Sequence, residues 1–342
     1  MNIRTYVPGD QERIEAYLSR SAASSQYHRI GWKRVVEESF GHPFEYLIAE
    51  RGAEITGVLP LVHINSLLFG NYMASLPYFN YGGVCAESES SREGLILAAI
   101  RLARHRKARF IEFRSTDKWD NGFPVKTGKV SMVLPLRSRP EDIWKGFPSK
   151  LRSQIRRPEQ DGMVTRIGRQ EELDGFYRVF STNMRDLGTP VYPKRFFGNI
   201  LRFFPRDTWI CNVYKEDRPV ASGFLAGFKN RMEIPWASSI RMYNRSSPNM
   251  LLYWSSIRFA CESGYEIFDF GRSTPGEGTY KFKAQWGAAP LQLYWHYWLS
   301  EGELLPELNP GNSRYEMAIA IWKKLPLPIA NLIGPGIVKN LP

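Results

Sequence analysis

Hydrophobic and polar residues alternate in two long stretches of the chain. The first, FEYLIAERGAEITGVLPLVHI at 44–64, is interrupted by a charged turn near 51–52, and the second, TWICNVYKEDRPVASGFLAGF at 208–228, by a turn at 216–217. A period of two is typical of β-strands, and a short polar break between two such runs indicates a hairpin. We therefore predict one β-hairpin in each half of the chain.

A helix and a strand follow each hairpin. Residues 91–108 and 247–264 carry apolar residues at helical spacing, and Gly264 is suited to the left-handed cap of the second helix. The strands that come next have similar sequences, ARFIEFRST at 108–116 and YEIFDFGRST at 265–274. The same order of elements occurs twice, which predicts a duplicated α+β fold.

Length and charge add a domain division and a class of partner. A chain of 342 residues is long for one average domain, and we expect domains at 1–145 and 146–342. Lys and Arg exceed Asp and Glu by 46 to 34, which gives a net charge of +12 and favours anionic partners. The three cysteines show no metal-ligand or disulfide pattern, so we expect no metal site and a reducing compartment.

The two ends of the chain bear on localisation. The first residues lack the apolar core of a signal peptide, and no stretch reaches the roughly 18 apolar residues of a spanning helix, so we expect a soluble, cytoplasmic protein. Residues 323–342 are apolar with flanking lysines. This segment is expected to pack on the second domain, and the alternative is peripheral contact with a membrane.

Several motifs resemble a known family. The run FDFGRSTPGEGTYKFKAQWGA at 268–288 resembles the F-D-x-G-R-S strand and the G-x-Y-x-F-K-x-x-W-G strand of Fem-type peptidyltransferases, whose architecture is a duplicated GNAT acyltransferase core. Residues 76–84, 148–163 and 183–197 resemble FemAB-related proteins associated with exosortase/PEP-CTERM exopolysaccharide systems. The resemblance implies two tandem GNAT-like domains, each a mixed twisted sheet flanked by helices.

The implied chemistry is transfer of an acyl or aminoacyl group to an amine. This reaction needs a deprotonated amine and a donor for the oxyanion that forms on the carbonyl. In GNAT folds, backbone N–H groups exposed where two strands splay apart serve largely as that donor. Such a site leaves little trace in a sequence, so the lack of a Ser-His-Asp set does not exclude an enzyme.

Three residues near the second strand copy are candidates for catalysis. Lys281 and Lys283 share one face of the predicted strand, and the resemblance places Lys283 where Fem-type enzymes hold a phosphate or polarise the transferred carbonyl; the alternative is an exposed strand lysine. Arg272 is expected to act beside it. Asp269 is either a catalytic base or a structural partner of Arg272 or a backbone N–H. Only the second copy has Gly271 and the glycine-rich loop, which places the site in the second domain or at its border with the first.

Other residues are candidates for substrate contact. Lys150, Arg152 and Arg156 lie on a predicted helix that Pro158 should end, and such a cluster gains most by meeting phosphate, although a solvated face is the common outcome. The remaining candidates lie in predicted loops or beside the catalytic residues; they are Asn80, Tyr81, Arg185, Ser273 and Tyr280.

The donor is expected to be aminoacyl-tRNA or acyl-CoA. The turn at 241–246 has Asn and Ser where acyl-CoA enzymes of the GNAT fold have glycines that approach pyrophosphate, which disfavours acyl-CoA. The resemblance implies aminoacyl-tRNA, and the net charge suits RNA, but the chain has no recognised RNA-binding module. We predict a transferase that acts on an amino group of a phosphate-bearing envelope or exopolysaccharide precursor, and the acceptor is expected to be an anionic small molecule or a lipid-linked one. The rivals are an acyl-CoA-dependent N-acetyltransferase and a non-catalytic protein that binds nucleic acid or polysaccharide.

Overall fold

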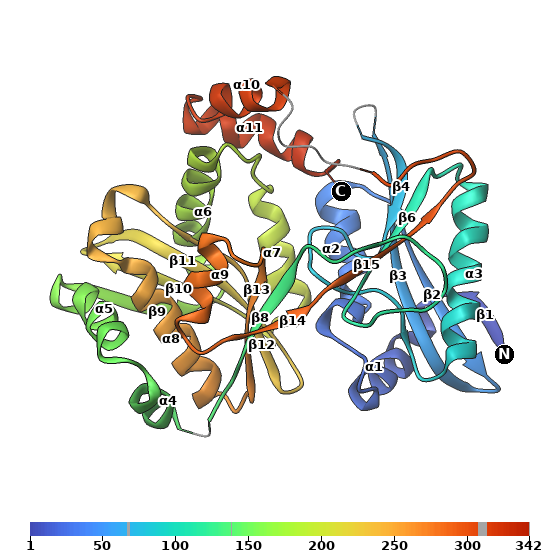
Figure 1. The fold of residues 1–342 in the computed structure, drawn as a ribbon, viewed down its shortest axis with the longest axis horizontal. Helices are drawn as coiled ribbons and strands as arrows, with labels where there is room; N and C mark the ends of the chain where they lie inside the picture. Colours follow the sequence, from blue (N-terminus) through green and yellow to red (C-terminus); the bar gives the residue numbers. More distant parts are fainter. Residues whose placement is uncertain (67–68, 138, 307–312, 342) are drawn as a thin grey trace. The chain divides into compact units, whose positions relative to one another are not determined.

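Figure 1 shows the computed structural model of the chain, which describes residues 1–66, 69–137, 139–306 and 313–341. The chain divides into two compact units. The first unit contains residues 1–130, 291–307 and 340–342, and the second contains residues 131–290 and 308–339.

The described residues of the first unit form an eight-stranded mixed sheet in the order β1-β2-β3-β4-β6-β15-β7, with β5 paired to β3. The pairing of β4 with β6 is parallel, and the other strand pairings in the described part of this sheet are antiparallel. The strands are β1 (Asn2–Thr5), β2 (Phe44–Arg51), β3 (Glu54–Ser66), β4 (Gly70–Ala74), β5 (Cys85–Ala86), β6 (Phe110–Ser115), β7 (Val125–Lys126) and β15 (Tyr294–Leu299). The helices are η1 (Pro8–Asp10), α1 (Gln11–Arg20), η2 (Gln26–His28), α2 (Gly31–Phe40) and α3 (Glu89–His105).

Helix α3 covers one face of this sheet through a stripe of small and apolar residues. Leu95, Ala99 and Ala103 are spaced four apart and fully buried, and they belong to one core cluster with Ile111 and Phe113 of β6. Burying a leucine side chain stabilises a fold by roughly 1.5–3 kcal/mol. The residues at helical spacing in α3 therefore lie on the side of the helix that packs in the core.

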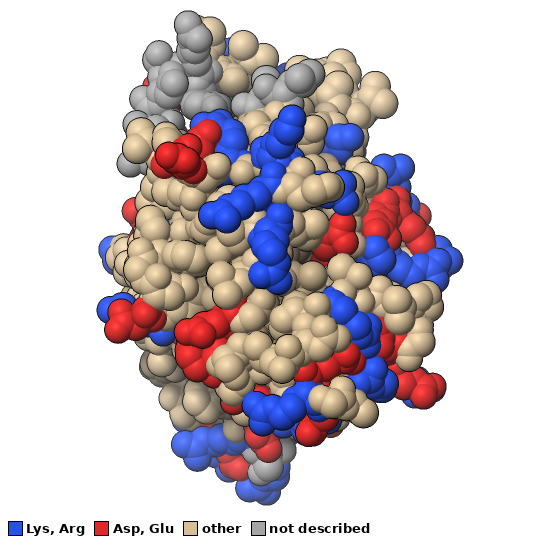
Figure 2. All heavy atoms as spheres, turned by 90° about the vertical axis from the view of Figure 1, so that its right-hand side faces the viewer, with Lys and Arg blue, Asp and Glu red and all other residues tan. Residues whose placement is uncertain are grey.

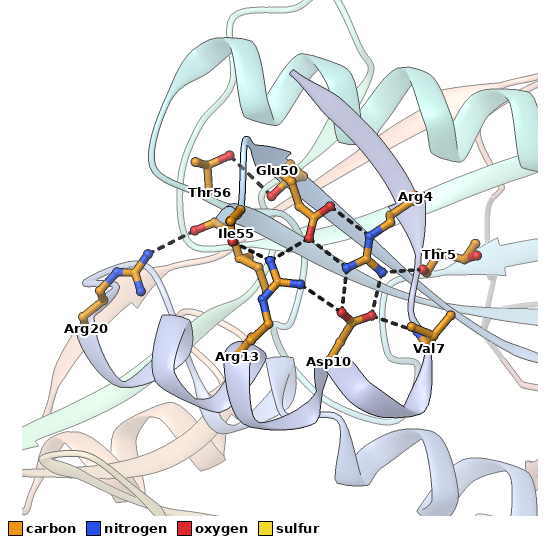
Figure 3. A network of polar contacts seen from close by, with 11 residues as sticks. Arg4, Thr5, Val7, Asp10, Arg13, Arg20, Glu50, Ile55 and Thr56 are labelled. Atoms are coloured by element: carbon orange, nitrogen blue, oxygen red, sulfur yellow. Dashed lines mark hydrogen bonds and ion pairs between the residues drawn. The ribbon is translucent and has the colours of Figure 1, made fainter.

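A network of charged side chains fixes β1 against the rest of the first unit (Figure 3). Arg4 donates to Asp10 at 2.6 Å and to Glu50 at 2.8 Å, and Arg13 donates to Glu50 at 2.9 Å. The hydrogen bond from Arg4 lowers the pKa of Asp10 to about 2. Both carboxylates are therefore ionised at neutral pH, and they join β1 to η1 and β2.

The described residues of the second unit are built on a seven-stranded sheet in the order β14-β8-β13-β12-β11-β10-β9. The strands are β8 (Val130–Pro135), β9 (Met163–Gly168), β10 (Thr208–Lys215), β11 (Arg218–Phe228), β12 (Arg231–Ser239), β13 (Ile267–Ser273) and β14 (Ala289–Gln292). The helices are α4 (Pro140–Gly146), α5 (Ser149–Gln160), η3 (Gln170–Glu172), α6 (Leu173–Leu187), α7 (Lys194–Phe203), η4 (Arg241–Ser246), α8 (Pro248–Glu262), α9 (Gly278–Ala284), α10 (Ser313–Trp322) and α11 (Leu327–Val338).

The predicted duplication is confirmed in the order and pairing of the elements. Hairpin β2–β3 corresponds to β10–β11, helix α3 to α8, and strand β6 to β13. In both units the strand after the helix pairs in parallel with the strand that follows the hairpin, β6 with β4 and β13 with β12. The α+β class with two mixed sheets flanked by helices is thus the observed fold.

The two compact units differ from the division expected after residue 145. Residues 131–145 cluster with the second unit, and residues 291–307 with the first. The second difference arises because β15 pairs with β6 along its whole length, from Tyr294 opposite Ser115 to Leu299 opposite Phe110. A strand late in the chain thereby completes the first sheet, which local sequence patterns do not reveal.

Helix α5 does not end at Pro158, as the sequence suggested, but continues to Gln160. Proline lacks only the N–H that would bond to the carbonyl of residue 154, and so close to the end of a helix this loss leaves few later hydrogen bonds to disturb. Leu151 and Ile155 are buried as expected.

Candidate active site

The edge between β12 and β13 opens part-way along the two strands. Parallel pairing covers residues 231–233 of β12 and 267–269 of β13, and both strands continue beyond it, to Ser239 and Ser273. The register between β11 and β12 shifts between residues 224–226, opposite this point, and a bulge bends a strand locally. The ends of β12 and β13 therefore leave the backbone ladder where a transferred carbonyl could meet backbone donors.

Lys283 reaches the end of β13 from helix α9. Its Nζ donates to the carbonyl oxygens of Gly271 at 3.0 Å and Arg272 at 2.8 Å, and the residue is only 7% exposed. Burial lowers the pKa of Lys283 to about 8, against the opposing effect of the Asp269 and Glu233 charges. An ammonium has three N–H donors, so two are used by these carbonyls and one remains for a substrate oxygen. A desolvated cation interacts strongly with negative charge that develops beside it.

The segment that carries Lys283 is helix α9, so the predicted strand is wrong. Lys281 is exposed while Lys283 is buried, and the two do not share a face. Phe282 and Trp286, four positions apart, both contact the ring of Tyr253, with centroids 5.1 and 6.1 Å away. A short run of alternating residues fits either period. Here the Lys281 N–H donates to the Glu277 carbonyl at 3.1 Å and the Gln285 N–H to the Lys281 carbonyl at 3.2 Å, which is the i to i−4 pattern of a helix.

Asp269 is fully buried, and its carboxylate forms hydrogen bonds and an ion pair. Its carboxylate accepts from Ser131 Oγ at 2.6 Å and from the Gly271 N–H at 2.8 Å, and it forms an ion pair with Arg231 at 3.1 Å. Arg231 is thus a cationic partner of Asp269, and the Gly271 N–H is the backbone partner that the sequence offered as one alternative. A carboxylate held in this way favours a positioning role for Asp269 over that of a catalytic base.

The other predicted residues of this region surround the end of β13. The Arg272 side chain is exposed, and Tyr280 is half-buried on α9. Ser273 is 4% exposed and Trp286 is 1% exposed, and within the described part of the chain Ser273 Oγ and Trp286 Nε1 have no hydrogen-bond partner. A buried polar atom without a partner costs about 1–3 kcal/mol, so a ligand oxygen that reached these atoms would recover that energy.

The chain is similar to several known proteins. Residues 146–284 match the family model described as an acetyltransferase (GNAT) domain. We name residues 146–284 the GNAT domain after this match. The UDP-N-acetylmuramoylpentapeptide-lysine N(6)-alanyltransferase of Weissella viridescens is 24% identical over 147 residues, which is 42% of this chain and 44% of that protein. The match therefore spans less than half the length of this curated relative.

Two solved structures resemble the whole fold. The crystal structure of FemX has a TM-score of 0.69 at 13% identity, covering 86% of this chain and 97% of FemX. A tandem GNAT protein from the clavulanic acid biosynthesis pathway has a TM-score of 0.53 at 12% identity, covering 89% of this chain and 99% of that one. The fold is therefore that of two GNAT-like domains, and part of the chain is similar in sequence to a Fem-type alanyltransferase.

In the turn that follows β12, backbone N–H groups form hydrogen bonds within the turn itself. Residues 241–246 form the short helix η4, in which the Tyr243 N–H donates to the Ile240 carbonyl at 3.0 Å and the Ser247 N–H donates to the Asn244 carbonyl at 3.0 Å. These N–H groups are used within the turn, and Pro248 supplies no N–H at the start of α8. This turn therefore offers few backbone donors to a pyrophosphate.

The basic cluster on α5 is partly committed to the protein itself. Arg152 donates to the Phe147 carbonyl at 3.0 Å, and the Arg156 guanidinium lies 5.3 Å from the centroid of the Trp144 ring. Lys150 and Arg156 are exposed, and Arg152 is half-buried. Arg152 therefore caps the end of α4, while Lys150 and Arg156 remain candidates for contact with an anion.

Arg185 connects α6 to a later segment of the chain. Its guanidinium donates to Asp186 at 2.6 Å and to the Leu325 carbonyl at 3.1 Å. These contacts account for a half-buried arginine without a substrate.

Asn80 and Tyr81 lie in the first unit, in the loop after β4. Tyr81 is 6% exposed and contacts Tyr27, with ring centroids 5.4 Å apart, while the Asn80 carbonyl accepts from Trp295 Nε1 at 3.1 Å. Tyr81 is therefore a core residue, and the loop as a whole packs against its own unit.

Two surface hollows are lined by residues other than Lys283. One, of about 300 Å³, is lined by Lys126, Thr127, Gly128, Lys129, Leu293 and Trp295; the other, of about 510 Å³, is lined by Gln170, Leu173, Lys194, Arg195, Gly198, Asn199 and Arg202. In the described ranges no group of three or more His, Cys, Asp or Glu side chains is placed to hold a metal ion.

Sequence reasoning missed the partners that hold this region together. Ser131 and Arg231 bind Asp269 from the neighbouring strands β8 and β12, and Glu233 lies opposite Asp269 in the β12–β13 register. The available signal was the polar pair Arg231 and Glu233, two apart at the start of an apolar strand. Only the strand order shows that this face meets Asp269.

Proposed function

We propose that the GNAT domain transfers an aminoacyl group from aminoacyl-tRNA to an amino group of a phosphate-bearing precursor of the cell envelope or of an exopolysaccharide. The observation that carries this proposal is the buried Lys283 ammonium, which lies at the end of β13 beside the opened β12–β13 edge with one donor to spare.

The reaction follows from the chemistry of the two reactants. The acceptor amine attacks the carbonyl carbon of the ester, the carbonyl oxygen gains negative charge, and the C–O bond to the tRNA then breaks. The amine loses one proton and the departing oxygen gains one. Lys283 donates to the charged oxygen or to a substrate phosphate, Arg272 supplies a second cation from the exposed end of β13, and Ser273 Oγ offers a buried hydroxyl.

The fold of η4 supports aminoacyl-tRNA over acyl-CoA as the donor, because the N–H groups that would hold a pyrophosphate are bonded within the turn. The net charge of +12 favours association with RNA. The alanyltransferase homologue, whose name gives a UDP-linked muramoylpentapeptide as the acceptor, supports a phosphate-bearing acceptor. Lys150 and Arg156 of α5 and Tyr280 of α9 are proposed as further substrate contacts.

We place the enzyme in the cytoplasm and in the branch associated with exosortase/PEP-CTERM systems on the motifs at 76–84, 148–163 and 183–197. In this assignment the acceptor is a lipid-linked or nucleotide-linked precursor. The identity of the amino acid is left to experiment.

The test compares Lys283→Ala with Lys281→Ala, an exposed lysine on the same helix. Aminoacyl transfer from a charged tRNA pool to UDP-linked and lipid-linked amino acceptors is followed by mass spectrometry. Loss of one donor to a developing oxyanion lowers turnover about 10²–10³-fold, so Lys283→Ala should show this loss while Lys281→Ala keeps full activity.

Three results would overturn the proposal. Equal turnover by Lys283→Ala and the unsubstituted protein would remove Lys283 from the mechanism. A rise in melting temperature with coenzyme A, and none with charged tRNA, would identify an acyl-CoA enzyme, since a ligand that binds the folded state raises its stability. Equal, salt-sensitive binding of charged and uncharged tRNA without any transfer would identify a polyanion-binding protein.

A further inference from the structure

The C-terminal helices α10 and α11 expose an apolar surface. Met317 is 66% exposed, Ile321 57% and Leu332 80%, and every residue from 316 to 321 is exposed. We define the apolar face as the exposed large side chains of both helices: Met317, Ile319, Ile321, Ile329, Leu332 and Ile333. Almost half of the exposed large apolar residues in the described chain belong to it, which exceeds the scattered exposure that is normal for a soluble surface.

A different side of α11 is already packed against the second unit. Ala330, Gly334 and Val338, spaced four apart, are buried, and α11 contacts α6 (Figure 1). A Cβ on Gly334 would lie 2.9 Å from the Val191 nitrogen, so the approach is close. The Arg185 bond to the Leu325 carbonyl fixes the link between the two helices. The packing expected for this segment is thus confirmed, and the apolar face is what remains outside it.

The composition of α11 separates it from an ordinary surface helix. A surface helix places charged residues on the side away from the core, whereas the twelve residues LPIANLIGPGIV contain no charge. The exposed Ile329, Leu332 and Ile333 are spaced as i, i+3 and i+4, which puts them on one side of the helix. Exposure of this apolar side to water is unfavourable in free energy.

Two lysines and one glutamate lie beside the apolar face, and the glutamate, Glu316, directly precedes Met317 in α10. Lys323 and Lys324 are exposed between α10 and α11, and residues 317–342 include no Asp or Glu. In a symmetric dimer built on this face, the same lysines would meet across the axis and repel. Anionic lipid headgroups would instead attract them, by about 1 kcal/mol for each lysine near the surface.

The lengths of the helices fix the mode of contact. A membrane-spanning helix needs about 20 residues, while α10 has 10 and α11 has 12. Among the described residues, no helix combines the length and the apolar character needed to cross a bilayer. Short apolar helices with lysines beside them lie in the plane of a bilayer, at the boundary between headgroups and acyl chains.

We propose that α10 and α11 attach this protein to the surface of an anionic lipid bilayer, with the apolar face below the headgroups and Lys323 and Lys324 among the phosphates. This attachment uses no residue of the β13–α9 region. Its failure and the failure of the proposed transferase activity can therefore be told apart.

The experiment is flotation of the full chain with two kinds of vesicle, phosphatidylcholine alone and phosphatidylcholine mixed with phosphatidylglycerol. The face variant is Met317→Ser/Ile321→Ser/Leu332→Ser. The matched control is Leu97→Ser/Val164→Ser/Met242→Ser, which removes three exposed apolar residues elsewhere in the chain. A third variant, Lys323→Gln/Lys324→Gln, tests the charge alone.

We expect the unsubstituted chain and the control to float with the anionic vesicles, and the face variant to bind about tenfold or more weakly. The lysine variant should lose the preference for phosphatidylglycerol, and added salt should have the same effect. Absence of flotation by the unsubstituted chain, or equal flotation by the face variant, would overturn the proposal. A concentration-dependent dimer in light scattering that the face variant abolishes, without vesicle binding, would show that the face joins two copies and would also overturn it.

Discussion

The end of β6 in the first unit and the end of β13 in the second have similar sequences but different surroundings. On β6, Glu112 accepts from Arg114 at 2.6 Å and from the Tyr297 hydroxyl, and the Arg114 guanidinium lies 4.4 Å from the centroid of the Trp295 ring. All of these groups come from the unit itself. On β13, the corresponding acid is the shorter Asp269, and a lysine from a separate helix lies at the end of the strand.

The loop after β4 fills the place beside β6. The Ser75 N–H donates to the Glu112 carbonyl at 2.8 Å, Ser75 Oγ accepts from the Arg114 N–H at 2.8 Å, and the Phe79 carbonyl accepts from Arg114 at 2.6 Å. A Cβ on Gly83 would lie 2.6 Å from the Arg114 carbonyl oxygen, so the loop runs directly against the strand. The backbone donors of β6 are therefore occupied.

Gly271 marks the point at which the second copy differs. Its φ of +73° lies in the left-handed region, where glycine is favoured, and its carbonyl accepts from Lys283. The first copy has Arg114 at the matching place. A duplicated fold can thus keep one strand end as a filled scaffold and the other as a site, with a few substitutions that decide which groups satisfy the strand.

The charged face in Figure 2 belongs with the scaffold interpretation. Lys and Arg are interspersed there with Asp and Glu. In the arginine-rich run at 101–109, Arg106 pairs with Glu45 at 3.0 Å and Arg109 with Glu303 at 2.6 Å, and such ion pairs are typical of a solvated surface. The arginine-rich run at 101–109 is therefore no indication of an RNA site.

The largest expected effect is on stability and comes from removing the buried ion pair at the end of β6. Glu112→Ala would leave the buried Arg114 without its carboxylate, and loss of one partner of a buried ion pair costs about 3–5 kcal/mol in free energy of unfolding. Urea denaturation should show this loss. Glu89→Ala, which removes an exposed partner of Arg92, should cost less than about 1 kcal/mol.

A double substitution sharpens this prediction. Glu112→Leu/Arg114→Met removes both charges and should restore much of the stability lost in Glu112→Ala, because no uncompensated charge then stays buried. If Glu112→Ala costs no more than the exposed control, the interpretation of the first copy as a filled strand end is wrong.

A smaller loss of stability is expected from Asp269→Asn on β13 of the second unit. Asparagine keeps the Oδ1 atom that accepts from Ser131 and the Gly271 N–H but loses the charged oxygen that pairs with Arg231. The expected cost is that of one hydrogen bond to a charged group, about 1.5–3 kcal/mol in free energy of unfolding. Because the Asp269 charge opposes the effect of burial on the pKa of Lys283, the pKa of Lys283 should fall further. Melting temperature and the pH profile of activity should both move, whereas a merely structural role would leave the pH profile unchanged.

The sequence predicted the fold well and the site in part. Period-two runs and helical stripes identify the hairpins, α3 and α8, because each buries one face against its own neighbours. They do not identify β15 as a strand of the first sheet or Arg231 as the partner of Asp269, because both depend on strand order. Lys283 was named through the resemblance of its motif, while the helix that carries it was misread as a strand from too short a run.

The smallest expected effect, and the one that separates two roles for Lys283, is a pH dependence. The pKa of Lys283 is lowered to about 8 by burial, from 10.5. If the ammonium donates to the transferred carbonyl or to a phosphate, turnover should fall as the pH rises through about 8, and Lys283→Arg, which stays charged, should lose this limb. A turnover that rises through the same range would make Lys283 a base.

Stability should move in the opposite direction to turnover. Between about pH 8 and 10.5 the lysine of the unfolded chain holds a proton that the folded one has released, so the unfolded state binds more protons and the free energy of unfolding rises with pH. Initial rates, corrected for hydrolysis of the donor ester, and urea denaturation at the same pH values give both curves. A loss of activity that coincides with a loss of stability would trace the alkaline limb to unfolding, because deprotonation of Lys283 alone stabilises the fold while it removes the donor.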